Sequence, residues 1–341
     1  MKNKKVSTPI KYLVNIALII AVYIIINSLI GNGTIGRYYV KLINPVGVYI
    51  IAAVSLNLTC GFLGQLPLGH AGFMAVGAYT SALITKSGII PNETLSFLVA
   101  LLAGGILAGI FGIIIGLPAL RLKGDYLAII TLGFGEMIRV IIQNLGFTGG
   151  ALGLKSIPRY TDFTWIYISC VVTVFLSYTL IHSRHGRAII AIRENEIAAE
   201  SCGIHTTYYK TMTFTVAAIF AGIAGGLLAH HTAFVSPGDF DFMKSIEILV
   251  MVVLGGMGSI VGSIVSATVL TLLPELLRAV SDYRMVVYSL LLVIVMIFKP
   301  SGLMGRYEFS LGRILDKLFG KSRKTADVGV PEKEVQKNGE N

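Results

Sequence analysis

The chain has 341 residues, of which 54% are hydrophobic and 13% are charged, and its formal net charge is +10. Its mean hydropathy of +0.76 excludes a soluble globular domain, and several apolar windows are long enough to span a membrane. The basic residues lie between apolar segments and at the chain ends, where they orient spans, so the charge does not indicate nucleic-acid binding. The three cysteines have no metal-like spacing to another Cys or His, so neither a disulfide framework nor a metal site is expected.

The N-terminal region predicts a retained membrane anchor. Residues 1–11 contain four lysines and no acidic residue, which predicts a cytoplasmic N-terminus. The apolar run 12–30 is too long for a signal peptide, and no small-residue cleavage site follows it. We expect it to form the first span, followed by an outer loop at 31–44 and a second span at 45–60.

The next segment, residues 61–72, is too rich in Gly and Pro for a continuous lipid-facing helix. Broken helix is tolerated in a bilayer only where protein or a water-filled cavity covers it. We therefore expect a broken or re-entrant segment, with its polar residues Gln65 and His70 beside a translocation path. A tight turn between two spans, or small residues that pack helices together, would explain the same composition.

Glycines at four-residue spacing predict close helix packing on two further spans. The pairs are Gly105 with Gly109 and Gly112 with Gly116 on the predicted span 95–117, and Gly222 with Gly226 on the predicted span 211–231.

The predicted span 126–145 carries polar residues along one face. Four residues recur at helical spacing on it: Leu132, Glu136, Arg139 and Gln143. Glu136 lies eleven residues beyond Asp125, which corresponds to about 16 Å along a helix and places it near the middle of a bilayer. Charges at that depth face the bundle interior or a wet cavity, and Glu136 and Arg139 are spaced to pair. This stripe either lines or gates a path, or its ion pair only fixes helix register.

The outer loop at 146–162 contains a near match to a phosphate-binding loop, TGGALGLKS. Leu154 occupies the position where that motif requires its second glycine. The chain is therefore not expected to hydrolyse ATP itself, and residues 163–181 are expected to cross back to the cytoplasm.

Residues 182–210 form the one long polar interruption within the apolar part of the chain. The middle of this stretch, 188–202, is rich in helix formers, and Gly203 follows it as a typical C-terminal stop. We expect a short amphipathic helix at the cytoplasmic face, with Ala198 and Ala199 leaving room for a neighbour. A solvated loop that merely joins two spans is the alternative.

Residues 245–280 contain two apolar runs separated by the sequence GGMGS, which predicts either two crossings or a re-entrant hairpin. A last span at 285–298 brings the expected number of crossings to between eight and ten. The membrane domain then covers 12–298, and 299–341 is a polar cytoplasmic tail. Residues 307–319 of this tail are expected to form an amphipathic surface helix, and those beyond 320 to be disordered.

The distribution of basic residues supports this orientation. The proposed inner segments carry 19 Lys and Arg residues, whereas the proposed outer loops carry six, or eight with Arg278 and Arg284 included. This bias predicts that both termini are cytoplasmic.

Several separated motifs resemble one family, and they extend over roughly residues 44–303. They read LNLTCGFLGQLPLGHAGFMAVGAYTSAL, LRLKGDYLAIITLGFGEMIRVI, TGGALGL and RENEIAAESCGI. They are similar to permease subunits of branched-chain amino-acid ABC importers, of the M type. The resemblance implies an all-α polytopic bundle and a partner set of a second permease, two ABC ATPase subunits and an extracytoplasmic binding protein. It also implies that Mg-ATP is bound by the ATPase subunits, and that this chain binds no cofactor of its own.

The resemblance also implies a role for the central polar stretch. In ABC importers a cytoplasmic permease loop with the pattern E-A-A-x-x-x-G docks into the ATPase. Here Ala198, Ala199 and Gly203 fit this pattern, while the glutamate is one place early, at Glu196. We therefore expect coupling to the ATPase through these residues and Arg193, and a path near Gln65, His70, Glu136, Arg139 and Gln143.

Three further interpretations stay open at this point. A related branch of the family serves urea or short amides instead of leucine, isoleucine and valine. A secondary transporter would use Glu136 to carry a proton or cation and would need no ATPase. A structural membrane subunit would have no path of its own.

Overall fold

The computed structural model describes residues 8–31, 37–122 and 124–277, with short pieces (286, 289–290, 293–294, 297–299 and 302–305) beyond them. The chain divides into a larger unit, Ile25–Glu308, and a smaller one made of Met1–Ile24 and Phe309–Asn341. Within the smaller unit the structure describes only residues 8–24, which belong to helix α1 (Thr8–Gly31). The predicted tail helix at 307–319 lies outside the described residues.

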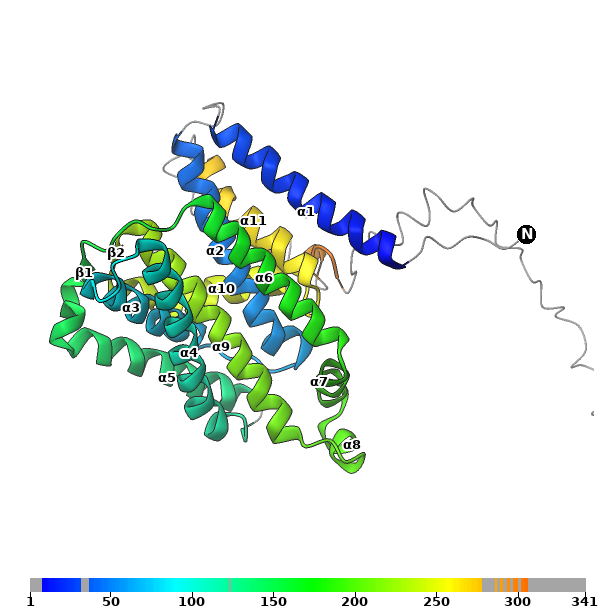
Figure 1. Cartoon of the computed structure of the whole chain (residues 1–341). Helices are drawn as coiled ribbons and strands as arrows, with labels where there is room; N and C mark the ends of the chain where they lie inside the picture. Colours follow the sequence, from blue (N-terminus) through cyan, green and yellow to red (C-terminus); the bar gives the residue numbers. More distant parts are fainter. Residues whose placement is uncertain are drawn as a thin grey trace, which may run out of the picture. The chain divides into compact units, whose positions relative to one another are not determined.

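The larger unit is built almost entirely from helices (Figure 1). Its long helices are α2 (Arg37–Asn57), α3 (His70–Ser87), α4 (Glu93–Ala119), α5 (Asp125–Asn144), α6 (Phe163–His182), α9 (Thr206–Thr232), α10 (Phe242–Gly255) and α11 (Ile260–Leu276). Its shorter elements are the π-helix η1 (Leu58–Phe62), α7 (Arg184–Glu194), α8 (Glu196–Ser201) and the 3₁₀ turns η2 (Gly146–Thr148), η3 (Gly150–Leu152) and η4 (Pro237–Phe240).

Within the described part of the chain, four helical segments are long and apolar enough to cross a membrane: Lys41–Phe62, Glu93–Ala119, Phe163–His182 and Thr206–Thr232. Helices α3 and α5 have 18 and 20 residues but are more polar, and α11 is apolar but shorter, with 17 residues. The exposed faces of α4, α5 and α6 carry many Ile, Leu, Val and Phe side chains, as lipid contact requires. The chain is an all-α, multi-pass membrane protein; its total of eight to ten crossings stays a prediction.

Close contact between glycines holds α3, α4 and α9 together. A Cβ atom at Gly77 of α3 would overlap the backbone of Gly222 in α9, and one at Gly225 would overlap the Met74 carbonyl. On α4, a Cβ at Gly112 would lie 2.8 Å from the Ala218 side chain. The predicted close packing through spaced glycines is confirmed, because helices approach this closely only where Cβ atoms are missing.

The predicted break in the segment 61–72 is confirmed. Helix α2 passes into the π-helix η1, which ends at Phe62, and α3 begins only at His70. The residues between them are non-helical and partly covered by protein: Leu63, Pro67 and Gly69 are buried, whereas Gly64 and Leu66 are exposed. The backbone N–H of Leu68 finds its acceptor in the Thr131 hydroxyl of α5, 2.9 Å away. Part of the broken backbone is thus covered and hydrogen-bonded inside the bundle.

Two short strands join the loops at one end of the bundle, which we call the strand end. Strands β1 (Leu154–Lys155) and β2 (Phe234–Val235) pair antiparallel, with Leu154 opposite Val235. Lys86, at the end of α3, also donates to the Lys155 carbonyl there. The predicted outer loop at 146–162 and the loop that follows α9 therefore lie at the same end of the bundle.

The two apolar runs expected within residues 245–280 form the two helices α10 and α11, and whether they cross the membrane twice or form a re-entrant hairpin stays a prediction. Helices α10 and α11 pack against each other across the turn Gly256–Ser259, which contacts Gly61 in η1. Beyond α11, the N–H groups of Leu303 and Met304 bond to the carbonyls of Leu254 and Gly255. The turn and this later segment therefore lie at the same end as α7 and α8, which we call the coupling end.

Candidate functional site

The central polar stretch folds as two helices, not as the single amphipathic helix that we expected. Asn195 separates α7 from α8 because its backbone is extended, with φ −160° and ψ 109°. Its side-chain oxygen accepts a hydrogen bond of 3.0 Å from the Ala198 N–H and so caps α8. The absence of Pro and Gly therefore did not make the stretch continuous, since an Asn cap starts a new helix.

The alanines and the glycine of the pattern have different environments. Ala198 is exposed beside Ile197, whose residue exposure is 72%, whereas Ala199 is only 4% exposed and packs inward. Of the two alanines expected to leave room for a neighbour, only Ala198 is exposed in this chain, and the coupling role of both stays a prediction. Gly203 has φ +82° after the end of α8, as a C-terminal stop requires, and this part of the prediction is confirmed.

An ion pair ties α8 to the bundle. The Lys210 ammonium, 4% exposed, lies 2.6 Å from the Glu196 carboxylate, which is 26% exposed. A buried ammonium needs such a partner, because removing a charge from water is costly. Glu196 therefore fixes α8 against the start of α9. It is also the glutamate that lies one position earlier than the family pattern requires.

Arg193, the last basic residue of α7, reaches the broken segment between α2 and α3. Its Nη1 donates a hydrogen bond of 3.0 Å to the Gly61 carbonyl in η1. The stem of the side chain lies against Gly64, where an added Cβ would be 2.7 Å from Arg193 Cγ. Its Nη2 pairs with the neighbouring Glu194 at 2.6 Å. The polar stretch is thus connected directly to the break.

Asn57 joins the same break to the α10–α11 turn. This fully buried residue accepts from the Gly258 N–H at 2.9 Å and donates to the Ser259 carbonyl and the Ser263 hydroxyl, both at 2.9 Å. A buried amide with three partners holds two backbone segments in one register. The coupling end is therefore a continuous network from α7 through η1 to α10 and α11.

On α5, the predicted ion pair is present. Arg139 Nε lies 2.7 Å from Glu136 Oε2, and each side chain is 30% exposed. The other oxygen of Glu136 accepts from the backbone N–H of Phe242 at 3.1 Å, at the first residue of α10. Glu136 therefore has two partners: it pairs with Arg139, and it also binds the positive N-terminal end of α10. Gln143, farther along the same helix, is exposed.

The two polar residues of the broken segment point elsewhere. His70 is 2% exposed and lies 2.9 Å from the Ser55 hydroxyl of α2. Gln65 keeps a buried side-chain oxygen for which the described residues provide no hydrogen bond. No hydrogen bond among the described residues joins Gln65 or His70 to Glu136, Arg139 or Gln143, and the role of these five residues in translocation stays a prediction.

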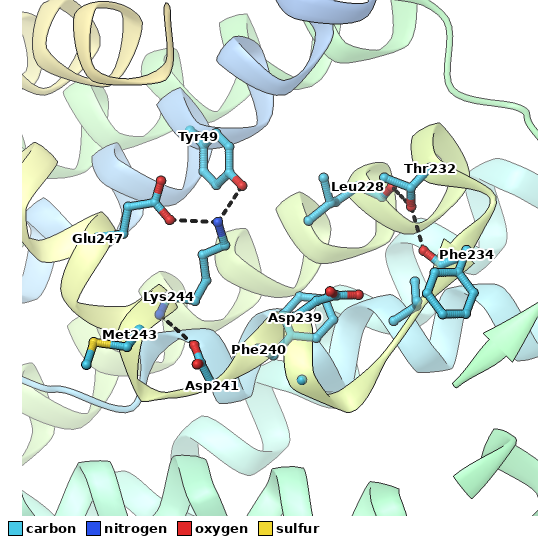
Figure 2. A pocket seen from close by; sticks show the side chains of 12 residues that line it. Tyr49, Leu228, Thr232, Phe234, Asp239, Phe240, Asp241, Met243, Lys244 and Glu247 are labelled. Atoms are coloured by element: carbon cyan, nitrogen blue, oxygen red, sulfur yellow. Dashed lines mark hydrogen bonds and ion pairs between the residues drawn. The ribbon is translucent and has the colours of Figure 1, made fainter. Parts of the chain in front are cut away.

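A pocket of about 510 Å³ opens near the strand end. Figure 2 shows Lys244 projecting from the first turn of α10 between Tyr49 of α2 and Glu247. Lys244 Nζ lies 2.7 Å from the Tyr49 hydroxyl and 2.7 Å from the Glu247 carboxylate. Asp239 and Asp241 add two further carboxylates to the lining.

The pocket was not predicted, because the apolar run expected in this part of the chain begins only at residue 245. Helix α10 in fact begins at Phe242 and includes both Lys244 and Glu247. The sequence did contain a signal for this site. Glu247 lies inside an apolar run, three residues after Lys244, just as Glu136 lies inside an apolar run, three residues before Arg139. Asn57 was missed in the same way, as a polar residue inside a predicted span.

Comparison with known proteins identifies the family. Residues 38–298 match the family described as "Branched-chain amino acid transport system / permease component". The chain belongs to this family. The permease is 37% identical over 305 residues to the high-affinity branched-chain amino acid transport system permease protein LivM of Salmonella typhimurium, covering 79% of this chain and 71% of LivM.

More distant relatives of this permease include LivH of the same organism, a permease protein of the same kind of system. It is 26% identical over 291 residues, covering 76% of this chain and 92% of LivH. A probable LivM of Methanocaldococcus jannaschii is 24% identical over 311 residues, covering 75% and 90% of the two chains. No solved structure matches the permease.

Proposed function

We propose that this permease is a subunit of an ATP-driven ABC importer that moves leucine, isoleucine and valine, or similar amino acids, into the cell. Both LivM and LivH carry the name of a branched-chain amino acid transport system. The presence of two different permease relatives supports a heterodimer with a second permease. Two ATPase subunits would bind and hydrolyse Mg-ATP, this chain would carry out no reaction of its own, and an extracytoplasmic protein would deliver the substrate.

The observation that carries the proposal is the connection made by Arg193. The segment that contains α7 and α8 exposes Ile197 and Ala198 at its tip, while Arg193 bonds to the broken membrane segment at Gly61. An ATPase that moved this segment would move the break and, through Asn57, the α10–α11 turn. In this proposal the coupling end is cytoplasmic, the strand end faces outward, and both termini are cytoplasmic, as the bias in Lys and Arg indicates.

The contacts of Glu136 favour this proposal over a secondary transporter. A carboxylate that exchanges protons with a transport path needs an oxygen open to that path, yet both oxygens of Glu136 already accept a hydrogen bond, one from Arg139 and one from the first N–H of α10. A permease for urea or short amides has the same architecture, and competition between substrates distinguishes it.

Co-purification followed by reconstitution tests the proposal. The tagged chain is extracted from its native membrane in mild detergent, and its partners are identified. An ATPase pair and a second permease are expected, with uptake of radiolabelled leucine into proteoliposomes that requires ATP and the binding protein. A chain that purifies alone and transports in an ion gradient without ATP would overturn the proposal, whereas uptake of urea in place of leucine would overturn the substrate.

A further inference from the structure

The pocket near the strand end has the dimensions and the chemistry of a small-molecule site. Its volume of about 510 Å³ lies within the roughly 300–1,000 Å³ typical of ligand sites. It extends from Thr232, at the end of α9, to Tyr49, about halfway along α2. Charged side chains within a membrane bundle that line a cavity are candidates for a substrate pathway.

Lys244 supplies a positive charge with one donor to spare. An ammonium group has three N–H donors, and those of Lys244 reach Tyr49 Oη and Glu247 Oε2. The ammonium also lies 4.6 Å from the centroid of the Tyr49 ring, and the side chain is 19% exposed. Because Lys244 lines the pocket, its third donor remains for a ligand carboxylate there, which would receive a charge-assisted hydrogen bond.

Asp239 and Asp241 supply the opposite charge. Asp239 Oδ2 accepts from the Ser236 N–H at 2.8 Å, and Asp241 Oδ1 accepts from the Lys244 N–H at 2.9 Å. Each carboxylate has a second oxygen that accepts no hydrogen bond from the described residues. Because these backbone bonds orient both groups, the pocket presents acceptors suited to a ligand ammonium.

The remaining lining is apolar and includes Leu228, Val235, Phe240 and Met243. A simple anion would meet three carboxylates beside one lysine, and a simple cation would meet the Lys244 ammonium. A ligand whose carboxylate and ammonium groups are attached to the same carbon, together with an apolar side chain, matches the lysine, the aspartates and the apolar part of the lining.

We infer that this pocket receives an amino-acid zwitterion with an apolar side chain, its carboxylate on Lys244 and its ammonium on Asp239 or Asp241. The inference rests on the proposed function and adds to it a site on this chain, distinct from that of the binding protein. Lys244 lies in the first turn of α10, and the last turn of α10 adjoins the Asn57 network at the coupling end. A ligand bound in the pocket would therefore contact the same helix that is held at the coupling end.

Direct binding tests this site in the assembled transporter, in nanodiscs and without the binding protein. The probes are radiolabelled L-leucine, L-leucinamide, which lacks the carboxylate, and 4-methylpentanoate, which lacks the ammonium. Leucine is expected to bind at least about tenfold more tightly than either analogue, since each analogue loses a charge-assisted hydrogen bond. Equal binding of the three probes, or no binding of leucine, would overturn the site.

Variants assign the two charges. Lys244→Met is expected to weaken leucine binding about tenfold or more and to abolish the preference for leucine over leucinamide. Asp239→Asn is expected to reduce the preference over 4-methylpentanoate, and it serves as the test if Lys244→Met fails to assemble. The matched control is Lys86→Met, because Lys86 is exposed at the same end of the bundle and bonds to Lys155 outside the pocket.

ATP-driven uptake with the binding protein, measured in parallel, separates this inference from the proposed function. Normal leucine uptake and binding in Lys244→Met would overturn the site and leave the importer intact. Lys244-dependent leucine binding in a complex without ATP-driven uptake would overturn the importer and leave the site intact. Binding of free leucine without the binding protein also excludes the alternative that the pocket only receives a basic side chain of that protein.

Discussion

Arg193 and Gly61 are 132 residues apart in the chain, yet Arg193 Nη1 donates a hydrogen bond of 3.0 Å to the Gly61 carbonyl. Gly61 belongs to the π-helix η1, an element that is rare and often found at functional sites. This bond connects the polar segment that precedes α8 to the point where the membrane helix α2 breaks.

We predict that Arg193→Ala lowers ATP-driven uptake about tenfold or more while the subunits still assemble. The reason is the loss of a charge-assisted hydrogen bond that connects α7 to η1. Uptake and ATP hydrolysis in proteoliposomes measure the effect, and hydrolysis is expected to continue without matching uptake. Arg187→Ala is the control, since Arg187 is exposed on the same helix. Normal uptake in Arg193→Ala would contradict the coupling role.

Asn57→Ala is expected to lower the stability of the bundle. The substitution removes three hydrogen bonds and leaves the Gly258 N–H without its acceptor, while the Ser259 carbonyl keeps its bonds from the Ser263 N–H and hydroxyl. Each buried polar group left unpaired costs about 1–3 kcal/mol. A thermal-unfolding assay in detergent should show a lower midpoint for Asn57→Ala and little change for Asn144→Ala, whose side chain is exposed. An unchanged midpoint would show that the network is not important for stability.

A charge swap distinguishes the two partners of Glu136. If the carboxylate served only to pair with Arg139, the double variant Glu136→Arg with Arg139→Glu would restore stability and uptake. We expect no restoration, because an arginine at position 136 would place a donor and a positive charge at the N-terminus of α10, against the Phe242 N–H. Comparison of the swap with Glu136→Gln, which keeps an acceptor for Phe242, measures this difference. Full recovery in the swap would contradict the role at α10.

Glu196 and Lys210 should respond unequally to substitution. Glu196→Gln leaves the buried ammonium of Lys210 without its carboxylate, whereas Lys210→Met leaves Glu196, 26% exposed, in contact with water. We therefore expect Glu196→Gln to destabilise the chain more than Lys210→Met. The double variant should recover part of the loss. Limited proteolysis near α8 and thermal unfolding report the order, and a reversed order would be evidence against the burial argument.

Gly77→Val is expected to prevent correct packing of α3 against α9. The added side chain would overlap the Gly222 backbone, which has no flexible atom that could move aside. Yield of the folded complex by size-exclusion chromatography measures the outcome. Gly133→Ala is the matched control, because a Cβ at Gly133 meets no atom within 4 Å and alanine favours helix. Equal yields for both variants would contradict the close approach of the helices.

The sequence by itself determined the class of protein, the break between α2 and α3, the ion pair on α5 and the presence of a helical polar segment within 182–210. Each of these depends on local composition or on helical spacing, which can be read without knowledge of distant contacts. The cap at Asn195 also has a local cause, although helix-forming composition concealed it.

Tertiary structure alone decided which partners these residues have. Arg193 meets Gly61, Asn57 meets the α10–α11 turn, and Glu136 meets Phe242, all across more than 100 residues of chain. The burial of Ala199 and the pocket around Lys244 were decided in the same way. Helical periodicity determines which residues share a face of one helix, but packing between helices determines what that face contacts, and no spacing within the chain encodes it.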